Sequence, residues 1–121
     1  MANAIARTVK TSSADLILVG LAGSRSLEAA REMGLRVAAE GFPDRGYNAD
    51  GSLISRVLPG ALIESPEEVA RQAVALIQTG RMDTLCLHGD HPNAAENAKL
   101  LRDVLKKNGI EVRGFSLTKG R

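Results

Sequence analysis

The chain has 121 residues, of which 44% are apolar, 25% charged and only 2% aromatic, and its 16 basic and 14 acidic side chains leave a net charge of +2. This length suits one small domain, which we place at residues 1–121, with a core of aliphatic side chains. No basic run is interleaved with aromatic residues, which argues against nucleic-acid binding, and no apolar run is long enough to span a bilayer. The N-terminus lacks an apolar signal core, so we expect a cytoplasmic protein.

The first part of the chain alternates between helix and strand patterns. Helical spacing, buried apolar runs and glycine stops predict a helix, a strand, a second helix and a second strand at residues 3–10, 15–20, 24–33 and 35–39. The run Asp-Leu-Ile-Leu-Val-Gly at 15–20 has no polar alternation, which is typical of a parallel strand buried on both faces.

The second part begins with a long loop and then returns to the same alternation. Turn residues, a serine cap followed by proline, and further apolar runs predict an extended piece, a helix, a strand, a helix and a fourth strand at residues 60–63, 65–79, 84–87, 93–108 and 110–112. This order indicates an α/β fold with a parallel sheet of about four strands.

Three candidate residues lie where predicted strands end. Gly20, Glu40 and His88 each sit at a carboxyl end, and parallel strands deliver such ends to one edge of a sheet. We therefore expect the three loops that follow these strands to share a site.

The loop after the second strand carries charges of both signs together with aromatic residues. Glu40 could act as a base or bind a metal or a substrate ammonium, or it could pair with a nearby arginine. Asp44, Arg45 and Arg56 could clamp a carboxylate or phosphate, because guanidinium matches such anions with two parallel hydrogen bonds. The alternative is that Asp44 and Arg45 order the loop. Tyr47 could donate to substrate, or it could close the loop over the core.

The turn after the first predicted strand carries small residues. Gly20, Gly23 and Ser24 could cradle a phosphate at a helix N-terminus, or they could form a strand-to-helix turn with Ser24 as its cap.

The segment after the third strand contains two histidines. We expect His88 and Asp90 to be catalytic, with His88 as acid or base, and His91 to belong to the start of the last helix. Donors this crowded cannot enclose a metal without distant ligands, so the identity of any metal stays open. Cys86, in an apolar run, is expected to be an inert thiol.

One combination of motifs resembles a known family. The pattern Glu-x-Phe-x-Asp-Arg-x-Tyr-x-x-Asp-Gly-x-Leu-x-x-Arg is present as Glu40, Phe42, Asp44, Arg45, Tyr47, Asp50, Gly51, Leu53 and Arg56. The segments Leu-Ile-Leu-Val-Gly-Leu-Ala-Gly-Ser at 16–24 and Leu-Cys-Leu-His-Gly-Asp at 85–90 match as well. Together they resemble the LamB/YcsF family, which forms the A subunit of the prokaryotic ATP-dependent 5-oxoprolinase, and they match only its C-terminal half.

The resemblance implies a fold, a reaction and partners. The fold would be half of a seven-stranded β/α barrel, and the reaction would be hydrolysis of 5-oxo-L-proline to L-glutamate with ATP. The chain would act as an amidohydrolase on a cyclic amide, with the B and C subunits of 5-oxoprolinase and a complementing N-terminal half as partners. A divalent metal is left open. Because motifs of the N-terminal half are missing, we expect the chain to be inactive alone.

Two further interpretations stay open at this point. One is a non-catalytic fragment or half-barrel that forms a homo-oligomer through exposed apolar sheet edges and helix faces. The other is a metal-dependent hydrolase related to deacetylases.

Overall fold

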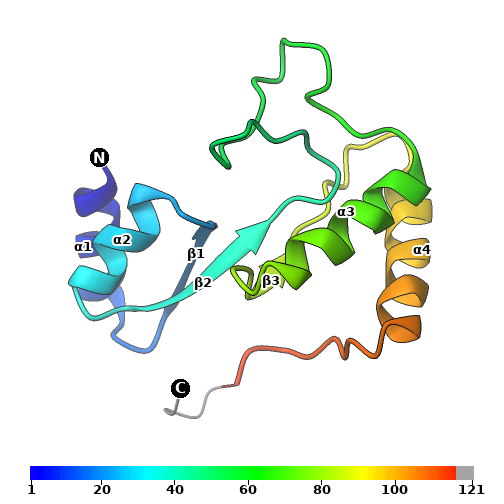
Figure 1. Ribbon diagram of the computed structural model, residues 1–121. Helices are drawn as coiled ribbons and strands as arrows, with labels where there is room; N and C mark the ends of the chain where they lie inside the picture. Colours follow the sequence, from blue (N-terminus) through cyan, green and yellow to red (C-terminus); the bar gives the residue numbers. More distant parts are fainter. Residues whose placement is uncertain (117–121) are drawn as a thin grey trace.

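The computed structural model describes residues 1–116 and shows four helices around a small parallel sheet (Figure 1). The helices are α1 (Ala2–Ser12), α2 (Arg25–Glu32), α3 (Pro66–Gln78) and α4 (Ala94–Lys107). The strands are β1 (Ile17–Leu21), β2 (Arg36–Gly41) and β3 (Thr84–Leu85). None of these helices combines the length and apolar character needed to cross a membrane. The last five residues of the predicted domain lie outside the described part.

The sheet has the order β1-β2-β3, and both pairings are parallel. In the register, Leu21 pairs with Glu40, and Glu40 in turn pairs with Thr84. The prediction of an α/β fold built on a parallel sheet is therefore confirmed.

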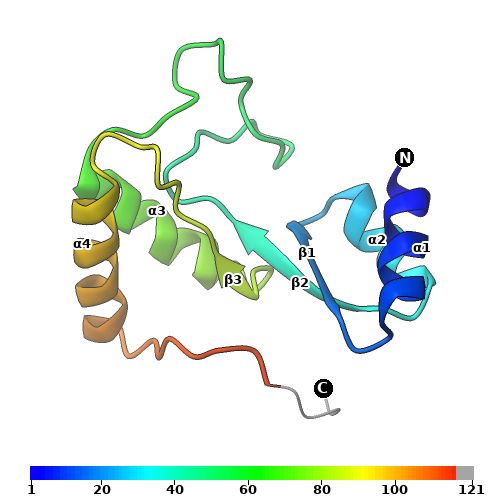
Figure 2. The same ribbon diagram turned by 180° about the vertical axis from the view of Figure 1, so that it is seen from behind.

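The sheet is smaller than predicted, with three strands in the described chain rather than about four. Residues 110–112 form no strand there; Ile110 N still donates to Leu105 O at 2.9 Å. Beyond it, the Nη2 of Arg36 donates to the carbonyl of Ser116 at 2.5 Å, so the segment runs toward the amino end of β2 instead of pairing with β3 (Figures 1 and 2).

The third strand is also shorter than the predicted 84–87. Cys86 N donates to Gly41 O at 2.9 Å, which adds one ladder bond beyond Leu85. Pro43 then follows on the neighbouring strand's chain, and it has no N–H to continue the ladder. The two segments separate there, and both enter loops at the carboxyl edge.

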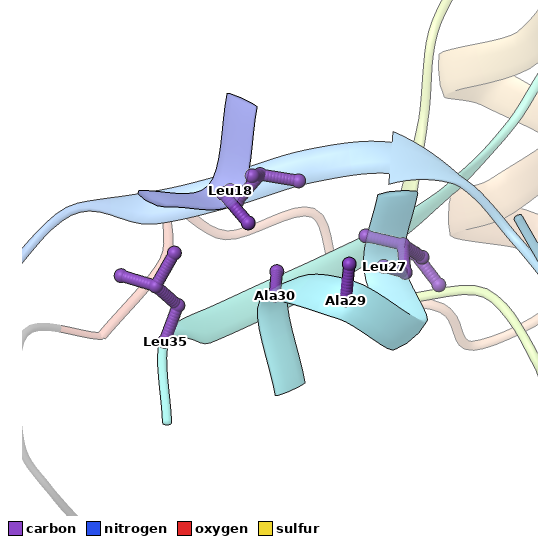
Figure 3. Packing of buried hydrophobic residues seen from close by; sticks show 7 residues of the cluster. Leu18, Leu27, Ala29, Ala30 and Leu35 are labelled. Atoms are coloured by element: carbon purple, nitrogen blue, oxygen red, sulfur yellow. The ribbon is translucent and has the colours of Figure 1, made fainter. Parts of the chain in front are cut away.

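The helices cover the sheet as two pairs. The α1–α2 pair packs on β1 and β2 around Leu18, Leu27 and Ala30 (Figure 3). The α3–α4 pair packs near β3 around Ala73 and Leu101. Because the core is built from aliphatic and alanine side chains, the scarcity of aromatic residues does not prevent close packing.

Candidate functional site

The carboxyl edge of the sheet brings two loops together. One loop follows β2 from Phe42 onward, and the other follows β3 to His88; both views show them running side by side above the sheet (Figures 1 and 2). A direct bond joins the two loops, because His88 N donates to Asp44 Oδ2 at 2.7 Å. The predicted shared edge thus exists for the loops that carry Glu40 and His88.

The pair of Asp44 and His88 is the centre of this edge. Asp44 is fully buried, at 0% exposure, and its Oδ1 lies 2.8 Å from Nδ1 of His88. A buried carboxylate that accepts both the backbone N–H and the ring N–H of His88 fixes the position and the tautomer of the imidazole. The proton then sits on Nδ1, which leaves the lone pair of Nε2 as an acceptor. The side chain of His88 remains 21% exposed.

Two aromatic residues close this pair on one side. The ring of Phe42 stacks on His88 with centroids 5.3 Å apart and planes at 29°. Phe42 N donates to the Tyr47 hydroxyl at 2.8 Å. Burial raises the pKa of Tyr47 above its ordinary value, so the phenol keeps its proton at neutral pH and has an O–H left to donate.

Arg45 does not face outward as an anion clamp in this structure. It is buried, and it donates from Nε to Ala61 O at 3.0 Å and from Nη2 to Ile54 O at 2.9 Å. Asp44 is likewise committed to His88. These contacts match the alternative interpretation, in which both residues order the loop; their binding of substrate stays a prediction.

The loop is folded as a hairpin-like unit with two antiparallel bridges, Arg45 to Leu62 and Tyr47 to Leu53. Gly46 lies at its crossing point. A Cβ added to Gly46 would come within 1.9 Å of the carbonyl oxygen of Gly60, so no other residue fits without moving the backbone.

Gln72, on α3, is a site residue that the sequence reasoning missed. Its Nε2 lies 3.2 Å from Phe42 O, 2.9 Å from Pro43 O and 2.7 Å from Arg45 O. One amide group thus binds the turn that presents Asp44. The signal was a polar residue between Val69 and Ala73, on the buried side of its helix.

Glu40 and Cys86 lie within electrostatic reach of each other. Burial raises the pKa of the Cys86 thiol, and the negative charges of Glu40 and Asp44 raise it further. Glu40 also adds to the rise that burial causes in the pKa of Tyr47. The carboxylate of Glu40 therefore belongs to the same neighbourhood as the Asp44–His88 pair, and Cys86 is kept as a thiol at neutral pH.

Other predicted site residues lie apart from this pair. Arg56 and Asp90 are exposed, and among residues 1–116 neither has a hydrogen bond or ion pair with Asp44 or His88. His91 is buried just before α4, and its Nε2 lies 2.8 Å from Ile63 O. This position agrees with its expected place at the helix start.

The glycine turn after β1 is organised as a helix start. Ser24 caps α2 by accepting from Leu27 N at 3.4 Å. A Cβ on Gly20 would lie 3.2 Å from the Leu27 side chain, so this glycine lets α2 approach β1. Gly23 has φ +77°, which favours glycine. The phosphate role of Gly20, Gly23 and Ser24 stays a prediction. No cluster of three or more His, Cys, Asp or Glu side chains is placed to hold a metal within residues 1–116.

The chain matches a known family over nearly its whole length. The LamB/YcsF family matches residues 1–120. This chain belongs to the LamB/YcsF family. A crystal structure of a lactam utilization protein from Thermus thermophilus superimposes with a TM-score of 0.84 at 43% identity, over 94% of this chain and 50% of that one.

Curated relatives of this LamB/YcsF chain have a common name. It is 46% identical over 109 residues to the A subunit of 5-oxoprolinase from Pyrococcus furiosus, which covers 80% of this chain and 43% of that protein. It is 43% identical over 130 residues to the protein of the same name from Nitrobacter hamburgensis, with 98% and 51% covered. The chain thus spans about half the length of the relatives it matches.

Proposed function

We propose that this chain is one component of an ATP-dependent 5-oxoprolinase, which hydrolyses 5-oxo-L-proline to L-glutamate. Its family membership and the names of its relatives support this proposal. Since the chain spans half the length of those relatives, the proposal includes a complementing N-terminal half, together with the B and C subunits, and no turnover by the chain alone.

The observation that carries the proposal is the buried Asp44 bonded to His88 at the carboxyl edge. Opening a lactam needs a group that takes a proton from water as the water attacks the carbonyl carbon. His88, with its proton held on Nδ1 by Asp44, offers Nε2 as that base. Asp44 is then a positioning residue for His88, instead of the substrate clamp that the sequence predicts.

The substrate itself suggests roles for the remaining groups. 5-Oxoproline has a ring N–H, a carbonyl and a carboxylate. In the proposed arrangement Glu40 accepts from the ring N–H and the Tyr47 O–H donates to an oxygen. Arg56, exposed on the same loop, keeps the role of binding the carboxylate, and Asp90 stays a proposed catalytic residue without a described contact to the pair.

ATP would supply the activation that a resonance-stabilised lactam carbonyl lacks. The described residues do not form a phosphate site by themselves, because Ser24 is used as a helix cap and Arg45 bonds two carbonyls. We therefore derive no step through ATP from this chain, and assign its binding to the complete assembly.

The test is an assay of glutamate release from 5-oxoproline with ATP. The chain is co-expressed with the half of the Thermus thermophilus relative that it does not match, and the B and C subunits are added. We expect turnover only with the full set, and a loss of about a hundredfold or more for His88→Gln. The matched control Asn108→Ala changes an exposed residue at the end of α4 and should leave the rate unchanged. Absence of turnover with the full set, combined with absence of 5-oxoproline binding, rejects the proposal.

A second candidate is a non-catalytic protein that forms oligomers. Exposed apolar side chains favour it, among them Val57 at 89% exposure and Leu58 at 56%. Light scattering distinguishes the candidates, because an oligomer that binds neither 5-oxoproline nor the complementing half supports this second function. The deacetylase-like interpretation has no metal-ligand cluster among residues 1–116 to support it.

A further inference from the structure

One face of the sheet is covered by all four helices. The apolar clusters place Leu18 and Ala39 against α1 and α2, and place Leu85 against α3 and α4. The parallel register puts these strand residues on the same face, because side chains alternate along a strand and Gly41 pairs with Leu85.

The opposite face carries side chains of the other parity. On β1 these are Ile17, Val19 and Leu21, and their register partners on β2 are Arg36, Ala38 and Glu40. Ala38 is buried, but Val19 is 43% exposed, and no helix of the described chain contributes to an apolar cluster on this side. Parallel sheets are normally covered on both faces, so this half-exposed face is unusual.

We propose that this second face, the Val19 face, is the docking surface for the polypeptide that forms the remaining half of the LamB/YcsF fold. The solved Thermus thermophilus relative contains the fold of this chain, with a TM-score of 0.84, as 50% of its own length. The rest of that domain must pack on surfaces that this half leaves open, and the Val19 face is an apolar surface of that kind.

The same face connects the interface to the candidate site. Glu40 stands at its carboxyl end, while Arg36 stands at its amino end and is already bonded to Ser116 O. A polypeptide seated on Val19 would therefore also form a wall beside Glu40. This links the inference to the proposed function, on which it rests: the pocket is complete only when the docked half is present.

The test measures binding without substrate, so that it stays separate from turnover. The full chain is co-expressed with a tagged form of the Thermus thermophilus half that it does not match, and the retained chain is quantified. Val19→Asp is compared with Val57→Asp, which makes the same change at an exposed valine of the loop. We expect a one-to-one complex for the unmodified chain, a loss of about tenfold or more for Val19→Asp, and at most about a twofold change for Val57→Asp.

A second variant guards against loss of folding. Val19→Thr keeps the β-branched shape and adds only a hydroxyl, so the strand survives and binding should fall between the other two variants. Failure of the unmodified chain to bind overturns the proposal. So does equal binding by Val19→Asp, equal loss in the Val57 control, or a dimer of this chain that Val19→Asp dissociates and that excludes the added half. A complex without turnover would instead reject the 5-oxoprolinase function and leave this interface intact.

Discussion

The α1–α2 core and the loop that follows β2 are stabilised by different interactions. The core around Leu27 is packed from aliphatic and alanine side chains and contains no charged group among its buried members. The loop at residues 42–63 instead buries Asp44 and Arg45, and it is fixed by hydrogen bonds from Arg45 and Gln72 to backbone carbonyls. The core tolerates approximate packing with gradual losses, whereas the loop depends on individual donors and acceptors, and it is the loop that presents the candidate site.

Truncating the core should produce the largest loss of stability. Leu27 is fully buried, so Leu27→Ala removes its contacts and leaves a cavity. We expect the free energy of unfolding to fall by about 2–5 kcal/mol in denaturant titration. Leu58→Ala, at a leucine that is 56% exposed, is the matched control and should change it by about 0.5 kcal/mol or less. Similar losses in both variants would contradict the described core.

A single methyl group should disturb the loop nearly as much. Gly46→Ala places a Cβ within 1.9 Å of the Gly60 carbonyl oxygen, so the two bridged segments must separate. We expect a loss of about 1–3 kcal/mol in the same titration. Gly89→Ala has no atom within 4 Å of the new Cβ and should be close to neutral. If the two alanine variants unfold at the same denaturant concentration, the loop does not have this arrangement.

Removing the amide of Gln72 tests the polar half of the comparison. Gln72→Leu keeps the size of the side chain but removes the donor to three carbonyls, and we expect a loss of about 1–2 kcal/mol. Gln78→Leu, at an exposed position on the same helix, is the control and should change little. Hydrogen exchange should rise in the loop, and a rise confined to α3 would argue against this role.

The smallest expected effect concerns the Cys86 thiol. Burial and the charges of Glu40 and Asp44 raise its pKa, so alkylation at about pH 8 should be slow because the thiolate is the reactive form. Glu40→Gln removes one negative charge, which lowers the pKa and should speed alkylation about two- to threefold. Glu64→Gln, a change at a glutamate outside this neighbourhood, should not alter the rate. An unchanged rate in Glu40→Gln would place the carboxylate farther from Cys86.

The same contrast explains what the sequence could predict. Apolar periodicity and caps predicted four helices and three strands, because aliphatic burial leaves a repeating pattern, as in the run at 15–20. The strand predicted at 110–112 is absent from the described chain, since its residues have that pattern but find no partner at β3.

The candidate site was predictable only in part. Residue types at strand ends pointed to Glu40 and His88, and the two loops do meet. That Asp44 would turn inward to His88, and Arg45 to two carbonyls, depends on long-range contacts that no local pattern encodes. Gln72 was missed for the same reason, because its partners lie 27 to 30 residues away.

The most direct test of the account is the tautomer of His88, read from its ring nitrogen chemical shifts by NMR at neutral pH. A buried Asp44 oxygen 2.8 Å from Nδ1 predicts a proton fixed on Nδ1 and an unprotonated Nε2. A proton found mainly on Nε2, or exchange between the two forms as in an unfolded chain, would contradict the pairing on which the proposed site depends.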